Sequence, residues 1–95
     1  MHRVTISRGD RRCERAPRAF AEFGGSAGAA LDILELVELA FHDCYGEVSP
    51  PPAVIDDICV VGGGDLPRFA SAARLAVDDF RDLRVTADSN RRRSG

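Results

Sequence analysis

The feature that most constrains the fold is an apolar stripe of helical period in residues 29–45, AALDILELVELAFHDCY. When successive residues are placed 100° apart, the apolar side chains gather on one broad arc, and the acids and His42 occupy the opposite arc. The apolar arc comprises Ile33, Leu34, Leu36, Val37, Ala40, Phe41, Cys44 and Tyr45. Gly46 follows directly, as expected for a left-handed C-terminal cap. The pattern predicts an amphipathic helix over 29–45.

A second helix is predicted over residues 50–61. Ser49 precedes three consecutive prolines, and a serine followed by proline is a helix-start signal, because proline in the first turn loses no needed N–H group. Apolar residues then recur at helical spacing, at Val54, Ile55, Ile58 and Val61. The alternative is a strand over 53–61. The adjacent acids Asp56 and Asp57 disfavour it, because a half-buried strand would alternate apolar and polar residues.

A third helix is predicted over residues 65–85. Asp65 is a good N-cap residue, and an apolar stripe follows it for about five turns. Arg74 and Asp78 are spaced for an ion pair on one helix face. We expect Leu75 to lie alone on the solvent side.

Three glycines, Gly62–Gly64, separate the second and third helices in the phrase ICVVGGGDL. A dinucleotide-binding loop needs a third glycine where this chain has Pro67, and it needs a preceding strand. Asp65 would also place a carboxylate where the phosphate should bind at the helix N-terminus. We therefore expect a helix–helix connector and no bound cofactor.

The ends of the chain lack a sustained apolar period. Residues 1–28 and 88–95 are rich in arginine and small residues, so we predict that both are mostly disordered, with a short helix over 16–23 as the alternative. The ordered domain is then residues 29–87. The predicted fold is all-α, a small three-helix antiparallel bundle between disordered basic segments.

Charge is strongly segregated along the 95 residues. Residues 1–28 carry six arginines against three acids, residues 29–90 carry four arginines against twelve acids, and the last five residues carry three arginines. An acidic centre therefore lies between two basic ends. Arginine-rich arms can bind phosphate without sequence preference, so a nucleic-acid-associated protein is the alternative function.

Few residues suggest catalysis or metal binding. Glu38 and His42 are spaced to share a metal ion, but the pattern places both, with Glu35, on the solvent face. The three cysteines, Cys13, Cys44 and Cys59, show no metal or redox spacing. Cys44 and Cys59 lie in apolar runs and are expected to pack as small hydrophobes. We therefore expect a protein that is not an enzyme and holds no metal.

The remaining function class is protein–protein interaction, by an adaptor, inhibitor or immunity-type protein. An acidic helical surface with apolar anchors would bind a protein partner or a second copy of the chain. The candidate surface comprises Glu35, Glu38, Leu39, His42, Leu75, Asp78, Asp79 and Asp82. No apolar run approaches the roughly 18–20 residues needed to span a membrane, and no secretory signal is recognisable, so we expect a cytoplasmic protein.

Overall fold

A computed structural model describes residues 8–46 and 49–94, and these residues form helices and connections without a strand. The helices are α1 (Arg8–Phe23), α2 (Ala27–Tyr45), α3 (Pro52–Gly62) and α4 (Leu66–Ser94), with a 3-10 turn, η1 (Gly24–Ser26), between the first two. The all-α prediction is confirmed, and the three predicted helices correspond to α2, α3 and the first part of α4. The alternative strand over residues 53–61 is wrong.

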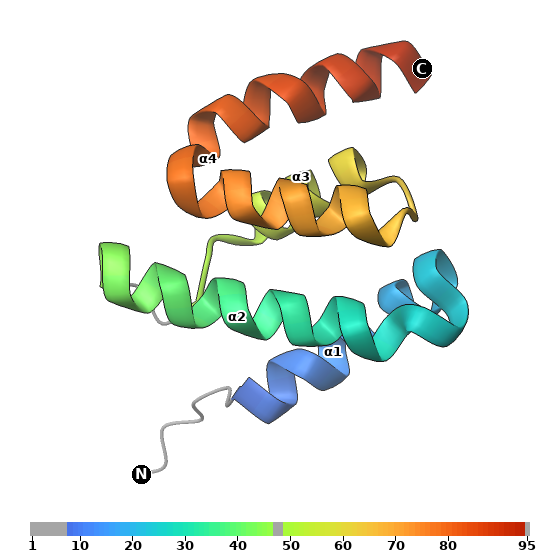
Figure 1. The fold of residues 1–95 in the computed structure, drawn as a ribbon, viewed down its shortest axis with the longest axis vertical. Coiled ribbons are helices and arrows are strands. Elements are labelled where there is room, and N and C mark those ends of the chain that lie inside the picture. The colour runs from blue at the N-terminus through green and yellow to red at the C-terminus, as the bar shows by residue number, and fades with distance from the viewer. Residues whose placement is uncertain (1–7, 47–48, 95) are drawn as a thin grey trace, which may run out of the picture.

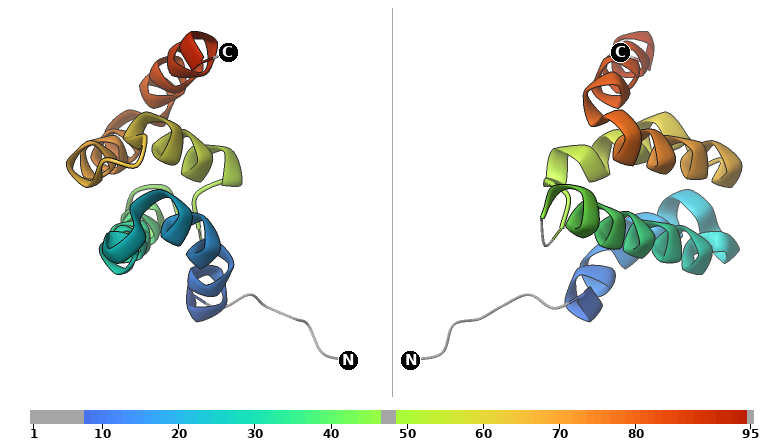
Figure 2. Two further views of the ribbon diagram at one scale, coloured as in Figure 1. Left: turned by 90° about the vertical axis from the view of Figure 1, so that its right-hand side faces the viewer. Right: turned by 60° about the vertical axis from the view of Figure 1, so that its left-hand side comes forward.

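The helices are stacked in three layers along the longest dimension of the molecule (Figure 1), which measures 47 × 30 × 22 Å. Figure 2 shows α1 beside α2 in one layer and α3 beside the first part of α4 in the next. The second part of α4 turns back and covers the far side of that layer. Helix α2 packs on α1 and α4, and α3 packs chiefly on α4. Consecutive helices reverse direction, as the antiparallel prediction requires.

The helix ends follow the predicted local chemistry at three places. Gly46 has a φ of +71° and its N–H donates to the His42 carbonyl oxygen at 3.0 Å, which closes α2. The Asp65 carboxylate accepts a 3.0 Å hydrogen bond from the Arg68 backbone N–H, so Asp65 caps α4 as predicted. Helix α3 has a proline in its first turn as predicted, but it begins at Pro52, two residues after the predicted start, and Ser49 does not cap it.

The prediction of disordered ends is wrong for the described residues. Residues 8–23 form α1, and α4 continues through residue 94. The sequence lacks an apolar period here because small side chains mediate the contact: Ala19 packs with Ala27 and Leu31 of α2 in a separate small core. Phe23 also contacts Phe69 edge to face, with ring centroids 4.8 Å apart. Residues 1–7 and 95 lie outside the described residues.

Helix α4 is broken at Asp79. This residue has extended backbone angles, φ −160° and ψ 90°, which separate residues 66–78 from residues 80–94. The Asp79 carboxylate accepts hydrogen bonds from the backbone N–H groups of Arg81 and Asp82 at 3.1 and 3.2 Å. Asp79 is therefore the N-cap of a second helical segment, which the prediction of one continuous helix over 65–85 did not include.

The main core lies where α2, α3 and α4 meet. Among its members, Phe69, Ile58 and Leu83 are almost fully buried. Two charged side chains are buried with them: Glu38 of α2 is 1% exposed and Asp57 of α3 is 2% exposed. Both had been assigned to solvent by helical period. Each faces a basic helix whose presence the sequence pattern did not indicate.

The glycine triplet is a packed turn between α3 and α4. Gly63 and Gly64 have φ of +56° and +78°, a region that glycine adopts without penalty. A Cβ at Gly64 would lie 3.0 Å from the Glu22 carbonyl oxygen of α1, and one at Gly62 would lie 3.0 Å from Phe69. The connector prediction is correct. The absence of side chains also lets α1 approach Gly64 closely and lets Phe69 approach Gly62 closely.

Candidate functional site

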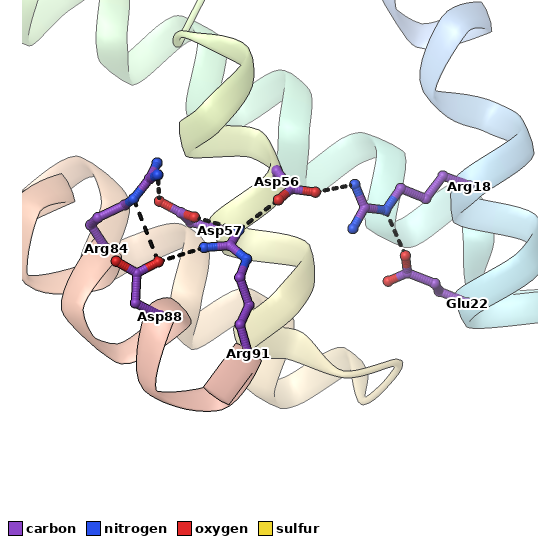
Figure 3. Close-up of polar contacts among 7 residues, drawn as sticks. All are labelled: Arg18, Glu22, Asp56, Asp57, Arg84, Asp88 and Arg91. Atoms are coloured by element: carbon purple, nitrogen blue, oxygen red, sulfur yellow. Dashed lines mark hydrogen bonds and ion pairs between the residues drawn. The ribbon is translucent and has the colours of Figure 1, made fainter. Parts of the chain in front are cut away.

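Seven charged residues form a network that joins α1, α3 and the second part of α4 (Figure 3). At its centre, Arg91 donates to Asp56 at 2.5 Å, to Asp57 at 2.7 Å and to Asp88 at 2.9 Å. Arg84 lies 3.6 Å from the other oxygen of Asp57 and 3.7 Å from Asp88. The charge of the buried Asp57 carboxylate is thereby balanced by two arginines of α4, as a buried charge requires.

Asp56 extends this network to α1. Arg18 donates to both Asp56 and Glu22 at 2.7 Å. The hydrogen bond from Arg18, together with the one from Arg91, holds the pKa of Asp56 below its ordinary value, although partial burial acts in the opposite direction. The hydrogen bonds to Glu22 and Asp56 in turn raise the pKa of Arg18, so both partners remain charged.

A second network surrounds Glu38 at the interface of α1 and α2. The Glu38 carboxylate accepts hydrogen bonds from Arg11, from Arg15 at 3.2 Å and from the Ser49 hydroxyl at 3.0 Å. Ser49 therefore bonds to α2, and Pro51 occupies the N-cap position of α3. Two acids earlier on α2, Asp32 and Glu35, accept hydrogen bonds from Arg12 of α1 at 2.8 Å and 2.9 Å. Glu35 and Glu38 hold α1 in place and do not form an open acidic surface.

The segregation of charge along the sequence therefore has an intramolecular explanation. Arginines of both ends pair with acids of the centre: Arg11, Arg12, Arg15 and Arg18 from α1, and Arg91 from α4. Phosphate binding by these arginines would have to displace carboxylates that are already in place. Arg92 and Arg93 are exposed.

The other predicted surface residues are spread over two regions. Leu39 and His42 are exposed on α2. Asp78, Asp79 and Asp82 are exposed around the break in α4, where Asp79 also serves as a cap. Leu75 is partly buried and packs on the main core, so its assignment to solvent is wrong. The predicted ion pair of Arg74 and Asp78 is present at 3.9 Å.

A surface groove that the sequence did not indicate runs between α2 and the first part of α4. It has a volume of about 380 Å³, and its floor is formed by small or short apolar side chains, among them Ala40, Ala73 and Val77. Leu36 lies on its wall and is 64% exposed, although the helical period had placed it in the core. Helix α2 is buried on two sides, by α1 and by α4, and Leu36 borders the groove on the α4 side but is not covered by that helix.

One end of this groove is acidic. Asp78 lines it together with its ion-pair partner Arg74, and the exposed Asp43 follows Ala40 by about one turn of α2. Asp79 and Asp82 follow on α4, with Arg81 as the basic residue of that stretch. The Tyr45 hydroxyl donates to the Val77 carbonyl oxygen at 2.7 Å, which brings the end of α2 against the break in α4. The groove, Leu36 and these acids are called the α2–α4 surface below.

The described residues contain no cluster of three or more His, Cys, Asp and Glu side chains suited to a metal ion. Cys13 and Cys44 are exposed, so the prediction that Cys44 packs as a core residue is wrong. Cys59 is buried as predicted, and its burial raises the pKa of the thiol to about 11. Such a thiol stays protonated near neutral pH and is a poor nucleophile.

Within residues 8–46 and 49–94, no helix combines the length and apolar character that crossing a bilayer requires. No protein-family model, curated protein or solved structure matches the chain.

Proposed function

We propose that this protein is an interaction module that binds a basic amphipathic helix of a partner protein on the α2–α4 surface. The observation that carries the proposal is the exposure of Leu36 beside an apolar groove. A leucine exposed singly is common, but one that borders a groove of apolar floor residues supplies a continuous surface for apolar anchors.

The chemistry of the groove favours a helix as the occupant. The groove lies between two roughly parallel helices (Figure 1), and the alanines among its lining residues leave space for the large side chains that an amphipathic helix presents at i, i+3, i+4 and i+7. Most acids elsewhere in the described residues are paired with arginines of α1 and α4, and Asp78 has a longer, exposed ion pair with Arg74 at 3.9 Å. Asp43, Asp78, Asp79 and Asp82 lie near the groove end and favour a partner with lysine or arginine beside its apolar stripe.

The test uses a synthetic peptide of about five helical turns, with leucines on one face and arginines on the other, titrated against the full chain by calorimetry. Leu36→Asp should weaken binding roughly tenfold or more, because a buried leucine contributes about 1.5–3 kcal/mol. Val85→Asp is the matched control: Val85 is 65% exposed and lies outside the groove. Both variants add the same negative charge, so general attraction of a basic peptide rises equally in both.

Three results would overturn the proposal. Equal affinity of the two variants would place the peptide elsewhere. Equal binding of a peptide with the same composition but a scrambled order would show attraction by charge alone. A concentration-dependent dimer in light scattering that Leu36→Asp converts to monomer would make a second copy the occupant. Circular dichroism of both variants checks that helical content is retained.

A further inference from the structure

We propose that a cavity at the centre of the four helices binds a neutral, apolar small molecule about the size of a monocyclic aromatic ring. The cavity has a volume of about 160 Å³, and residues of α1, α2, α3 and α4 line it. This inference is independent of the α2–α4 surface, because the two sites share none of their lining residues.

The wall of the cavity is almost entirely apolar. The side chains that define it are Ala19 and Phe23 of α1, Leu34 of α2, Ile55 and Cys59 of α3, and Phe69 of α4. The raised pKa of Cys59 keeps its thiol neutral, so it behaves as part of the apolar wall. Water would find few hydrogen-bond partners here, and a cavity of about 150 Å³ with such a lining can remain dry and bind benzene.

The mouth of the cavity is charged but balanced. Glu14, Arg15, Arg18 and Glu22 of α1 border it, and two of each sign give no net preference for an anion or a cation. Arg18 is held there by its hydrogen bonds to Glu22 and Asp56 (Figure 3). A ligand that carried a charge would have to displace one of these ion pairs, which favours a neutral ligand.

Binding would also reinforce the docking of α1. This helix contributes Ala19 and Phe23 to the wall, and its main apolar contact with α2 is otherwise a small cluster around Ala19, Ala27 and Leu31. A molecule in the cavity would contact α1 and the other three helices at the same time. Ligand binding should therefore slow hydrogen exchange in residues 8–23.

The experiment measures binding of benzene to the full chain by calorimetry and by thermal unfolding, with Ala19→Leu and Ala21→Leu as paired variants. Both residues lie on α1, but Ala19 lines the cavity and Ala21 is exposed outside its lining. Leucine at position 19 should fill the space and weaken benzene binding about tenfold or more, whereas leucine at position 21 should leave the affinity within about twofold. Phenol, which has the same ring and a hydroxyl group, should bind more weakly than benzene.

A second measurement keeps the proposal testable if Ala19→Leu does not fold. Benzene titrated into the wild-type protein should shift the NMR signals of the Leu34 methyl groups and the Phe69 ring saturably. Signals of Val85, which is exposed and does not line the cavity, should not move. The absence of saturable binding, unchanged affinity in a folded Ala19→Leu variant, or shifts that are not centred on the cavity would each overturn the proposal.

Discussion

Arg91, near the end of α4, donates a 2.7 Å hydrogen bond to Asp57, a carboxylate of α3 that is 2% exposed. The two residues are 34 positions apart in the sequence. Asp57 lies under the second part of α4, so this helix must stay in place for the buried charge to remain paired. Arg91 thus has a structural role, and the second part of α4 is held against α3 by the acids Asp56 and Asp57.

Replacing Arg91 with methionine should destabilise the fold, because Asp57 would keep only the longer contact with Arg84. We expect a lower midpoint of urea unfolding and faster hydrogen exchange in residues 80–94. Arg92→Met is the control, since Arg92 is adjacent and exposed. Equal changes in the two variants would argue against the assigned role of Arg91.

The depressed pKa of Asp56 predicts acid sensitivity. Its carboxylate is stabilised chiefly by Arg18, so its folded pKa lies below its unfolded value of about 3.9. The stabilisation is present above that value and is lost as the pH falls through the folded pKa. In urea unfolding, Asp56→Asn should therefore destabilise the protein at pH 6 and have less effect at pH 3. In an Arg18→Met background this pH dependence should shrink, and its persistence would point to another titrating group.

Loss of Glu38 should be more damaging than loss of Glu35. Glu38→Ala leaves Arg11 and Arg15, both largely buried, without this carboxylate, and we expect a loss of about 3 kcal/mol in the free energy of unfolding. Glu35 is partly exposed, so Glu35→Ala should cost less. Denaturant titration of both variants measures the difference, and equal losses would contradict the buried role of Glu38.

The sequence predicted the helices that carry long apolar stripes. It did not predict the segments that are held by small side chains or by ion pairs. The stripes of α2 and of the first part of α4, with the caps at Gly46 and Asp65, were sufficient to place those helices. The second half of α1 was predicted only as the alternative helix over 16–23, and its first half was not predicted. Its apolar contact relies on Ala19, and its stabilising partners are acids more than twenty residues away. Local composition cannot reveal such pairing.

The candidate site was predicted only in part for the same reason. Helical period divides a helix into one buried and one exposed side, but α2 is buried by both α1 and α4. Glu38 was consequently predicted at the surface but is buried in an ion-pair network, and Leu36 was predicted in the core but is exposed. A signal for the break in α4 was present in the sequence, since Asp79 with Asp82 three residues later resembles a helix start.

That break gives a prediction of its own. Asp79→Ala removes the acceptor for two backbone N–H groups and should cost about 1 kcal/mol of unfolding free energy. Asp79→Ser should restore most of the loss, because serine also caps well. Asp78→Ala is the neighbouring control, and its exposed ion pair with Arg74 predicts a smaller cost. Indistinguishable denaturation curves for the two alanine variants would mean that the cap contributes little.

The glycine connector allows a test that separates backbone strain from close packing. Gly63 and Gly64 both have positive φ, so alanine at either position should cost about 1 kcal/mol through strain. At Gly63 a Cβ would meet nothing within 4 Å, but at Gly64 it would press on the Glu22 carbonyl oxygen, a backbone atom of α1. Gly64→Ala should therefore cost more than Gly63→Ala in urea unfolding, and it should also speed hydrogen exchange in α1. Equal costs, with α1 unaffected, would mean that α1 does not pack on the turn.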